Sequence, residues 1–247
     1  MITWRGPSQF PGGADVIMCA AALEDVPLPF ALGLLSAAER ASAGRFKLVA
    51  RFTEFVKTRA LLRWVLGRCS GCDPRQFEIE DGGGAPRLTG NTTGLHFNVS
   101  HSAGQAVVAV GRDPLGIDIE RARDDIDVLS IAFACFHPQE RAHVVRADGG
   151  ARIETFFNIW TRKEAYLKGT GTGLSAELTS FSTIAESGRV ATGDTGHGIW
   201  HVHALDAAPG YKAALATRHA HPRLRQLYFD TAAGPERDAG LSVSVHF

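Results

Sequence analysis

The order of short strand-like segments constrains the fold of this chain more than any other feature. Residues 95–99, 106–110 and 115–120 are each largely apolar, and glycine or proline turns separate them. No helical stretch lies between these segments, so the chain does not alternate strictly between strands and helices. This order predicts an α+β fold.

Helical patterns flank these strands on both sides. Residues 35–66 are predicted to be helical, because Ser36 and Glu39 form a capping-box pattern and apolar residues recur at helical spacing before Gly67. A boundary near Arg112-Asp113-Pro114 is expected to divide the chain into two halves, residues 1–112 and 113–247. The other expected helices are 139–145 and 153–168, and the other expected strands are 77–80, 178–184, 198–205, 211–216 and 241–247.

The charge balance and the hydropathy exclude several classes of protein. The 247 residues contain 26 Lys and Arg against 26 Asp and Glu, which gives no net charge with histidine neutral. A protein that binds duplex nucleic acid needs a surplus of cations, so we expect no nucleic-acid partner. No apolar run approaches the ~20 residues of a membrane span, and the first residues lack a secretion signal. We therefore expect a cytoplasmic protein that does not bind membranes. We also expect a monomer.

Neither the cysteines nor the histidines form a metal-binding pattern. Cys69 and Cys72 have the spacing of a zinc or redox pair, but no second pair supplies the further ligands that zinc needs. We expect ordinary thiols near a helix end. The histidines of the second half lack acidic or thiolate neighbours at ligand spacing, so they are expected to be solvated on strands; they are His197, His201, His203, His219 and His221.

Two carboxylates are predicted to share one face of the strand at residues 115–120. Side chains alternate along a strand, so Ile117 and Ile119 face one side while Asp118 and Glu120 face the other. One interpretation is an amphipathic edge strand with a solvated acidic face. The other is a site for a hard cation such as Mg²⁺, which binds one or two carboxylates and keeps positions for water and phosphate oxygens.

The predicted helix at 153–168 carries a second row of polar residues. Trp160, Glu164 and Lys168 are four residues apart and share one face, with Lys163 beside them. A surface Glu–Lys pair would explain this row. The tryptophan and the neighbouring phenylalanines instead favour a partly buried Glu164 with an altered pKa, which suits proton transfer.

Polar residues also follow the apolar start of the strand near residue 97. Ser100 and His101 are sequence neighbours that face apart on an extended chain, and no Gly-x-Ser-x-Gly elbow is present, which argues against a Ser/His hydrolase. An ordinary polar turn and a polar cup suited to a phosphate both remain open. Upstream, Arg59 is the cation we select for phosphate recognition, because guanidinium matches phosphate geometry.

Together these motifs resemble the 4'-phosphopantetheinyl transferase superfamily, and specifically its larger, two-half type similar to the surfactin-synthetase activating enzyme. The resemblance covers residues 35–211. It rests most on Gly116-Ile117-Asp118-Ile119-Glu120 and, about forty residues later, Trp160-Thr161-Arg162-Lys163-Glu164-Ala165. Phe97-Asn98-Val99-Ser100-His101-Ser102, Phe136 with Glu140, and Pro209-Gly210-Tyr211-Lys212 occur in the family's order.

The resemblance implies transfer of the phosphopantetheine arm of coenzyme A to a serine of an acyl or peptidyl carrier protein, with release of adenosine 3',5'-bisphosphate. It implies two pseudo-symmetric halves with coenzyme A bound in the cleft between them. Asp118, Glu120 and Glu164 would hold Mg²⁺, and Glu164 or a metal-bound water would accept the proton of the attacking serine. The cofactor-binding residues would be Arg59, Ser100, His101, Lys163 and Lys168, with Lys168 at the pyrophosphate.

The chain departs from the family's pattern at positions that concern the phosphates of coenzyme A. Gly84-Ala85-Pro86 lacks a lysine that relatives carry there, which Arg87 is expected to replace, and basic residues of the first helix are replaced by Glu39 and Ser42. Two rival functions stay open: a binding module for coenzyme A or a carrier protein without catalysis, and a nucleotide-dependent phosphotransferase, which would lack a P-loop. Residues 121–136, with Ile126, Val128 and Leu129, are a candidate docking surface for the carrier protein.

Overall fold

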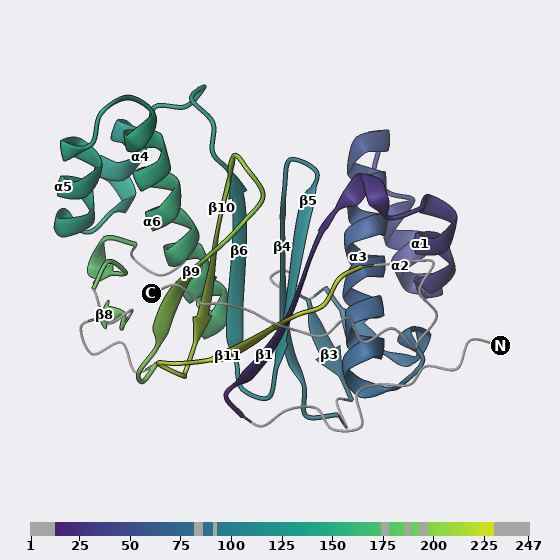
Figure 1. Ribbon diagram of the computed structural model, residues 1–247. Helices are drawn as coiled ribbons and strands as arrows, with labels where there is room; N and C mark the ends of the chain where they lie inside the picture. The colour runs from purple at the N-terminus through teal and green to yellow at the C-terminus, as the bar shows by residue number, and fades with distance from the viewer. Residues whose placement is uncertain are drawn as a thin grey trace. The chain divides into compact units, whose positions relative to one another are not determined.

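The computed structural model of the protein describes residues 13–81, 86–90, 93–173, 178–185, 189–192 and 197–229. These residues divide into two compact units: unit 1 comprises those of 13–112 together with 223–229, and unit 2 those of 113–222. Each unit combines a mainly antiparallel sheet with helices (Figure 1), which confirms the predicted α+β class. The predicted pseudo-symmetry of the two halves stays a prediction.

Unit 1 is built on a four-stranded sheet with the order β11-β1-β5-β4. β1 (Asp15–Ala22) pairs antiparallel with β5 (Gln105–Gly111), and β5 pairs antiparallel with β4 (His96–Ser102). β11 (Arg223–Gln226) lies parallel to β1. The prediction that the second half runs to residue 247 is therefore wrong for β11, because its backbone pairs with a strand of unit 1.

The prediction of a single helix over residues 35–66 is wrong, because two separate helices cover this part of unit 1. α2 (Ala37–Ala43) begins at the predicted capping box, in which Ser36 and Glu39 exchange backbone-to-side-chain hydrogen bonds of 2.7 and 3.2 Å. It ends at Gly44, and the chain is extended at Leu48 before α3 (Val49–Ser70) begins. α3 then runs past Gly67 and ends at Gly71, which has a positive φ of 75°.

α3 lies along one face of this sheet and supplies much of the core of unit 1 (Figure 1). The predicted apolar stripe of Leu61, Leu62, Val65 and Leu66 is almost completely buried and belongs to one cluster with residues of β1 and β5. α1 (Leu28–Leu34) packs against α3. The antiparallel pair of β2 (Glu78–Glu80) and β3 (Arg87–Thr89) completes the unit. The glycine-rich sequence at 81–84 predicts a turn after β2, but all of it except Asp81 lies outside the described residues.

Unit 2 has a three-stranded antiparallel sheet with the order β6-β10-β9. Its strands are β6 (Leu115–Arg121), β9 (His201–Leu205) and β10 (Tyr211–Thr217). α6 (Gly149–Thr170) lies along one face of this sheet (Figure 1). α5 (Pro138–Arg146) packs against α6, and α4 (Val128–Cys135) packs against α5, around a core that includes Phe136, Val144 and Phe156.

Several elements of unit 2 differ from the sequence predictions. The strand predicted at 178–184 is a 3-10 turn at Leu178–Ser180 followed by the short β7 (Phe181–Ser182), which pairs with β8 (Ala191–Thr192). β9 begins at His201 rather than at residue 198. α4 was not predicted, and its first turn is capped by Asp127, whose side chain accepts from the backbone of Ser130. The strand predicted at 241–247 lies outside the described residues.

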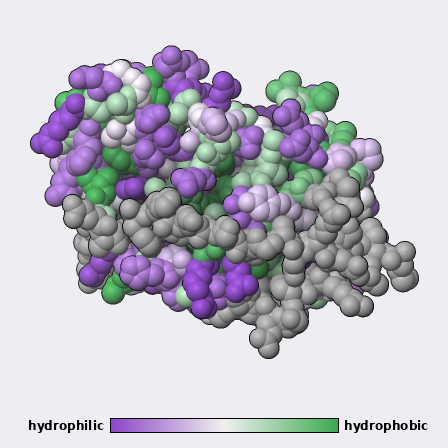
Figure 2. Space-filling view, viewed as in Figure 1, coloured by the Kyte–Doolittle hydropathy of each residue, from purple (hydrophilic) through white to green (hydrophobic). Residues whose placement is uncertain are grey.

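Some large hydrophobic side chains are exposed on the described surface. On the face seen in Figure 2, hydrophobic residues form small patches among hydrophilic ones. Of the helices in the described ranges, none is long and apolar enough to cross a membrane. The large hydrophobic residues with exposed side chains are Phe46, Leu48, Val49, Phe133, Val145, Ile199 and Tyr228.

Candidate active site

β6 carries the two predicted carboxylates on the face that packs against α6. Gly116 contacts the backbone of α6, and side chains alternate along a strand, so Asp118 and Glu120 share the face of Gly116. Ile117 and Ile119 are buried on the opposite face. Asp118 is only 2% exposed, so the alternative of a solvated acidic face is wrong for this residue.

Two glycines, Gly116 of β6 and Gly169 of α6, allow the backbones of these two elements to come into direct contact. A Cβ atom on Gly116 would clash with the backbone oxygen of Ala165 and the backbone nitrogen of Gly169. A Cβ atom on Gly169 would lie 2.6 Å from the ring of Trp200. This role of Gly116 and Gly169 was not predicted from the sequence, although an isolated glycine in a strand is a signal of close backbone approach.

α6 brings Glu164 and Lys168 to this face of β6. The two residues are one helical turn apart, as predicted, and the Lys168 ammonium lies 2.7 Å from Oδ1 of Asp118. Trp160, one turn earlier, stacks on Phe156 with 5.9 Å between ring centroids. The predicted row of Trp160, Glu164 and Lys168 therefore combines an aromatic end with a polar end that meets β6.

Glu164 has an altered ionisation because of where it lies. The pKa of its carboxyl group is raised above the usual value, first because burial disfavours the charged form and then because Asp118 is close. Lys168 acts in the opposite direction, and Glu120 raises the pKa further. Three carboxylates from two elements thus lie within electrostatic range of one another, next to one ammonium group.

The same residues are chemically suited to a divalent cation. Within the ranges that the structure describes, no group of three or more His, Cys, Asp or Glu side chains is arranged to hold a metal ion. Mg²⁺ does not need such a group, because one or two carboxylates suffice when water and phosphate supply the other oxygens. The repulsion that raises the pKa of Glu164 is also what a bound cation would relieve. The donor set fits Mg²⁺, and the assignment of Asp118, Glu120 and Glu164 as its ligands stays a prediction.

Lys163 does not lie where the sequence predicted a cofactor-binding residue. Its side chain is 1% exposed, and its ammonium contacts Glu140 at 2.8 Å and the carbonyl oxygens of Leu178 and Phe181 at 2.7 and 2.8 Å. An ammonium has three donors, so these three acceptors use all of them. Burial lowers the pKa of Lys163, while Glu140 acts to raise it. A direct contact between Lys163 and a phosphate is not compatible with this arrangement.

Ser100 and His101 lie on β4 in unit 1, as predicted, and face opposite sides of the sheet. Ser100 is buried, whereas the His101 side chain is 39% exposed and its Nδ1 lies 3.1 Å from Oε1 of Glu54 on α3. The sequence predicted that they lie at the turn, but they lie within β4, which continues to Ser102, and the turn follows at Ala103 and Gly104. A common contact of Ser100 and His101 with coenzyme A stays a prediction.

A pocket of about 610 Å³ lies next to Glu54, within unit 1. Arg51 and Lys57 of α3 line it, together with Leu23 and the turn at Gly104. Arg51 contacts Glu54 at 3.1 Å, and Lys57 donates to the backbone oxygen of Leu23 at 2.7 Å. The pocket therefore has polar walls of both signs.

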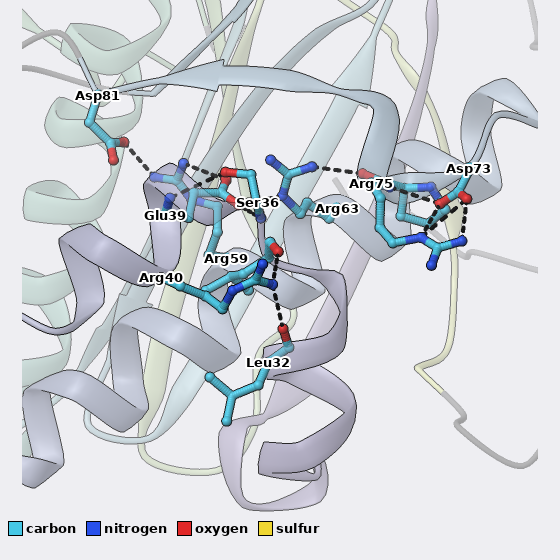
Figure 3. A network of polar contacts seen from close by, with 11 residues as sticks. Leu32, Ser36, Glu39, Arg40, Arg59, Arg63, Asp73, Arg75 and Asp81 are labelled. Atoms are coloured by element: carbon cyan, nitrogen blue, oxygen red, sulfur yellow. Dashed lines mark hydrogen bonds and ion pairs between the residues drawn. The ribbon is translucent and has the colours of Figure 1, made fainter.

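Arg59 is held in a buried network of polar contacts (Figure 3). Its guanidinium contacts Glu39 at 3.2 Å and also contacts Asp81. Glu39 is 4% exposed and binds Arg63 at 2.7 Å, and Arg63 donates to the carbonyl of Pro74. The predicted phosphate contact of Arg59 is disfavoured, because both of its terminal nitrogens already bind carboxylates.

This chain is similar to known proteins that share one family description. A family model described as the 4'-phosphopantetheinyl transferase superfamily matches residues 114–216, which include β6 and α6. The chain is 30% identical over 184 residues to the 4'-phosphopantetheinyl transferase psf-1 of Bacillus pumilus, covering 73% of this chain and 77% of that protein.

Two further relatives carry the same description. A 4'-phosphopantetheinyl transferase of Bacillus subtilis is 31% identical over 163 residues, covering 64% of this chain and 71% of that protein. The 4'-phosphopantetheinyl transferase HetI of a Nostoc species is 37% identical over 145 residues, covering 57% of this chain and 61% of that protein. The predicted resemblance is confirmed: this chain belongs to the 4'-phosphopantetheinyl transferase superfamily.

Proposed function

We propose that this protein transfers the 4'-phosphopantetheine arm of coenzyme A to a serine hydroxyl of an acyl or peptidyl carrier protein, releasing adenosine 3',5'-bisphosphate. The observation that carries this proposal is the meeting of Asp118, Glu120 and Glu164 with Lys168 where β6 packs against α6. Relatives named as 4'-phosphopantetheinyl transferases support the same reaction.

Lys168 would stabilise charge on the pyrophosphate of coenzyme A. Its side chain is 26% exposed, and a contact with Asp118 holds its ammonium next to the carboxylates. When a serine attacks the phosphorus, negative charge grows on the departing phosphate, and a fixed cation stabilises that charge more than it stabilises the bound substrate.

Glu164 would accept the proton of the attacking serine. Burial, Asp118 and Glu120 raise the pKa of its carboxyl group, Lys168 lowers it, and a bound cation would lower it as well. The role of Glu164 as the base therefore rests on its place, one helical turn before Lys168 on the face of α6 that meets Asp118. The same three carboxylates would hold Mg²⁺, which supplies positive charge to the pyrophosphate oxygens when bound.

The nucleotide end of coenzyme A would bind unit 1 near His101. The pocket beside Glu54 supports this part of the proposal, because Arg51 and Lys57 offer donors and Glu54 offers an acceptor in a volume of about 610 Å³. Arg59 is disfavoured for this role by its two carboxylate partners. Arg87 is exposed on β3, so it remains the candidate to replace the lysine missing from Gly84-Ala85-Pro86.

The docking surface predicted for the carrier protein changes at its apolar residues. Val128 is buried in the core around α4, and Ile126 and Leu129 are partly buried against that core. Phe133 of α4 is 55% exposed, with the guanidinium of Arg141 5.0 Å from its ring. We propose Phe133 and Arg141 as the contact that replaces them, because an apolar group beside a cation suits an acidic partner.

Mass spectrometry of apo carrier proteins tests the proposed function. The protein, coenzyme A and Mg²⁺ should add the phosphopantetheine arm to at least one carrier, and removal of Mg²⁺ by a chelator should stop the reaction. Asp118→Ala and Glu164→Gln should each abolish labelling in a folded protein. Near-normal turnover by either variant contradicts the mechanism.

Coenzyme A binding by calorimetry without transfer to any carrier would instead support a non-catalytic binding module. Size-exclusion chromatography tests the expected monomer.

A further inference from the structure

A buried ion pair lies on a different face of α6 from the proposed catalytic residues. Lys163 precedes Glu164 in the helix, so its side chain points about 100° away from that of Glu164. It reaches Glu140 of α5, with 2.8 Å between Nζ and Oε2, and the two side chains are 1% and 0% exposed. Neither charge is available to solvent or to a ligand in this arrangement.

The pair ties three separate parts of unit 2 together. The Lys163 ammonium donates to the carbonyls of Leu178 and Phe181, in the segment that leads into β7. Oε1 of Glu140 accepts from both the backbone nitrogen and the hydroxyl of Thr183, at 2.8 and 2.9 Å. The other oxygen of Glu140 also caps α5 by accepting from the backbone of its N-cap residue at 3.1 Å. One ion pair therefore joins α5, α6 and the segment around β7.

The Lys163–Glu140 pair lies in an apolar environment, which restricts the positions of both side chains. The Lys163 ammonium lies 4.0 Å from the centre of the Phe181 ring and 5.9 Å from that of Phe136. A buried ion pair with fully used donors and acceptors gives little net stability compared with apolar side chains of the same volume. It does fix the direction of each partner, because any displacement would leave a charge unpaired in an apolar site.

The other side of α6 is fixed by the close contact between Gly116 and Gly169. The backbone contact with β6 there and the Lys163 network lie on different sides of the helix, and Gly169 is adjacent to Lys168. Together, the backbone contact with β6 and the Lys163 network restrict rotation of α6 about its axis. A carboxylate lies roughly 6 Å from the axis of its helix, so a rotation of roughly 10° moves it by about 1 Å.

We propose that Glu140 and Lys163 are positioning residues: their buried pair sets the rotation of α6, so that Glu164 and Lys168 meet Asp118 in a reactive arrangement. This inference rests on the proposed transferase function. It assigns Lys163 a role through its neighbours rather than through coenzyme A. A displacement of about 1 Å can lower a rate by about 100-fold, so the effect should appear in kcat.

The experiment compares Glu140→Gln and Lys163→Met with the unchanged protein. Each variant is first shown to be folded by circular dichroism and thermal melting, and carrier-protein labelling is then measured at saturating coenzyme A. We expect kcat to fall by about 10- to 100-fold while KM for coenzyme A changes by less than about threefold. Lys163→Arg keeps the charge and the donors, so it should recover a part of the rate that Lys163→Met loses.

Val144→Ala is the matched control. Val144 lies one turn after Glu140 on the same helix and is 0% exposed, but it belongs to the apolar cluster. The cavity left by this change should lower the melting temperature, while kcat should stay within about twofold of the unchanged protein. An equal loss of kcat in Val144→Ala and in Glu140→Gln would show that general destabilisation is responsible, and would overturn the proposal.

The outcomes separate this inference from the proposed function. Absence of transfer by the unchanged protein contradicts the function itself. Normal transfer by the unchanged protein, with kcat within twofold in folded Glu140→Gln and Lys163→Met, overturns only the positioning role. If neither variant folds, Thr183→Val decides, because it removes a single donor from Glu140 and keeps the backbone contact. A drop of several-fold in its kcat supports the inference, and an unchanged kcat overturns it.

Discussion

Lys168 of α6 donates to Asp118 of β6, with 2.7 Å between Nζ and Oδ1. This contact places a cation between two elements that each carry carboxylates. We predict that Lys168→Met lowers kcat by about 100- to 1000-fold, because the growing charge on the departing phosphate loses a fixed partner. Single-turnover labelling of a carrier protein measures the change. A Lys168→Met variant with near-normal turnover would show that the ammonium does not act on the reacting phosphate.

Gly116 should not tolerate a side chain. Gly116→Ala forces a methyl group into the backbone of α6 at Ala165, and we expect a loss of roughly 1–3 kcal/mol or more in the free energy of unfolding together with loss of transfer. Gly150→Ala in the same helix is the control, because a Cβ atom there meets nothing within 4 Å and alanine favours helices. Urea unfolding of both variants tests this prediction, which fails if they are equally stable.

Glu39 should be a structural residue of unit 1. Glu39→Gln leaves the buried guanidinium groups of Arg59 and Arg63 without their shared carboxylate, and we expect a destabilisation of about 3–5 kcal/mol. Arg75, which is also drawn in Figure 3, forms an ion pair with Asp73 at the surface. Arg75→Ala should leave the unfolding midpoint unchanged. Comparable shifts in chemical denaturation for these two variants would contradict a buried role for Glu39.

His203 should make the stability of the protein depend on pH. It was expected to be solvated, but it is only 9% exposed, and its ring donates to the carbonyl of His219. Burial lowers its pKa below the unfolded value of about 6.5, and His201, His221 and Arg162 lower it further, while the bond to His219 opposes them. The unfolded chain then binds more protons as the pH falls through 6.5, so the free energy of unfolding decreases.

Denaturation of His203→Gln over a range of pH measures this contribution. The fall in stability from about pH 7.5 to about pH 5.5 should be smaller in the variant than in the unchanged protein. Above about pH 7.5 the difference between the two proteins should no longer change with pH. An identical pH dependence in both proteins would mean that His203 does not contribute.

Much of the candidate site followed from local sequence patterns. The shared face of Asp118 and Glu120 depends only on strand alternation, and the shared face of Glu164 and Lys168 depends only on helical spacing. That the two faces meet is a tertiary fact, which the resemblance to a family supplied and spacing alone did not. Gly116 lies on the same face of β6 as Asp118 and contacts the backbone of α6, so it belongs both to the strand pattern and to the contact between β6 and α6.

The predictions that were wrong have physical causes that no local sequence pattern shows. In one continuous helix Glu39 and Arg59 would lie about 30 Å apart, and the break after Gly44 is what lets their side chains come within 3.2 Å. Lys163 follows the same helical pattern as Glu164, and only the packing of α5 and the segment around β7 makes it inaccessible.

The parallel pairing of β11 with β1 has a consequence for folding during synthesis and for truncated fragments of the protein. β11 follows all of unit 2 in the sequence, yet it covers one edge of the unit 1 sheet. During synthesis, the described strands of unit 2 are made before β11, which completes this edge of the unit 1 sheet. A fragment that stops at residue 112 would leave the N–H and C=O groups of β1 unpaired along that edge, where a second molecule could add to it and aggregation would begin.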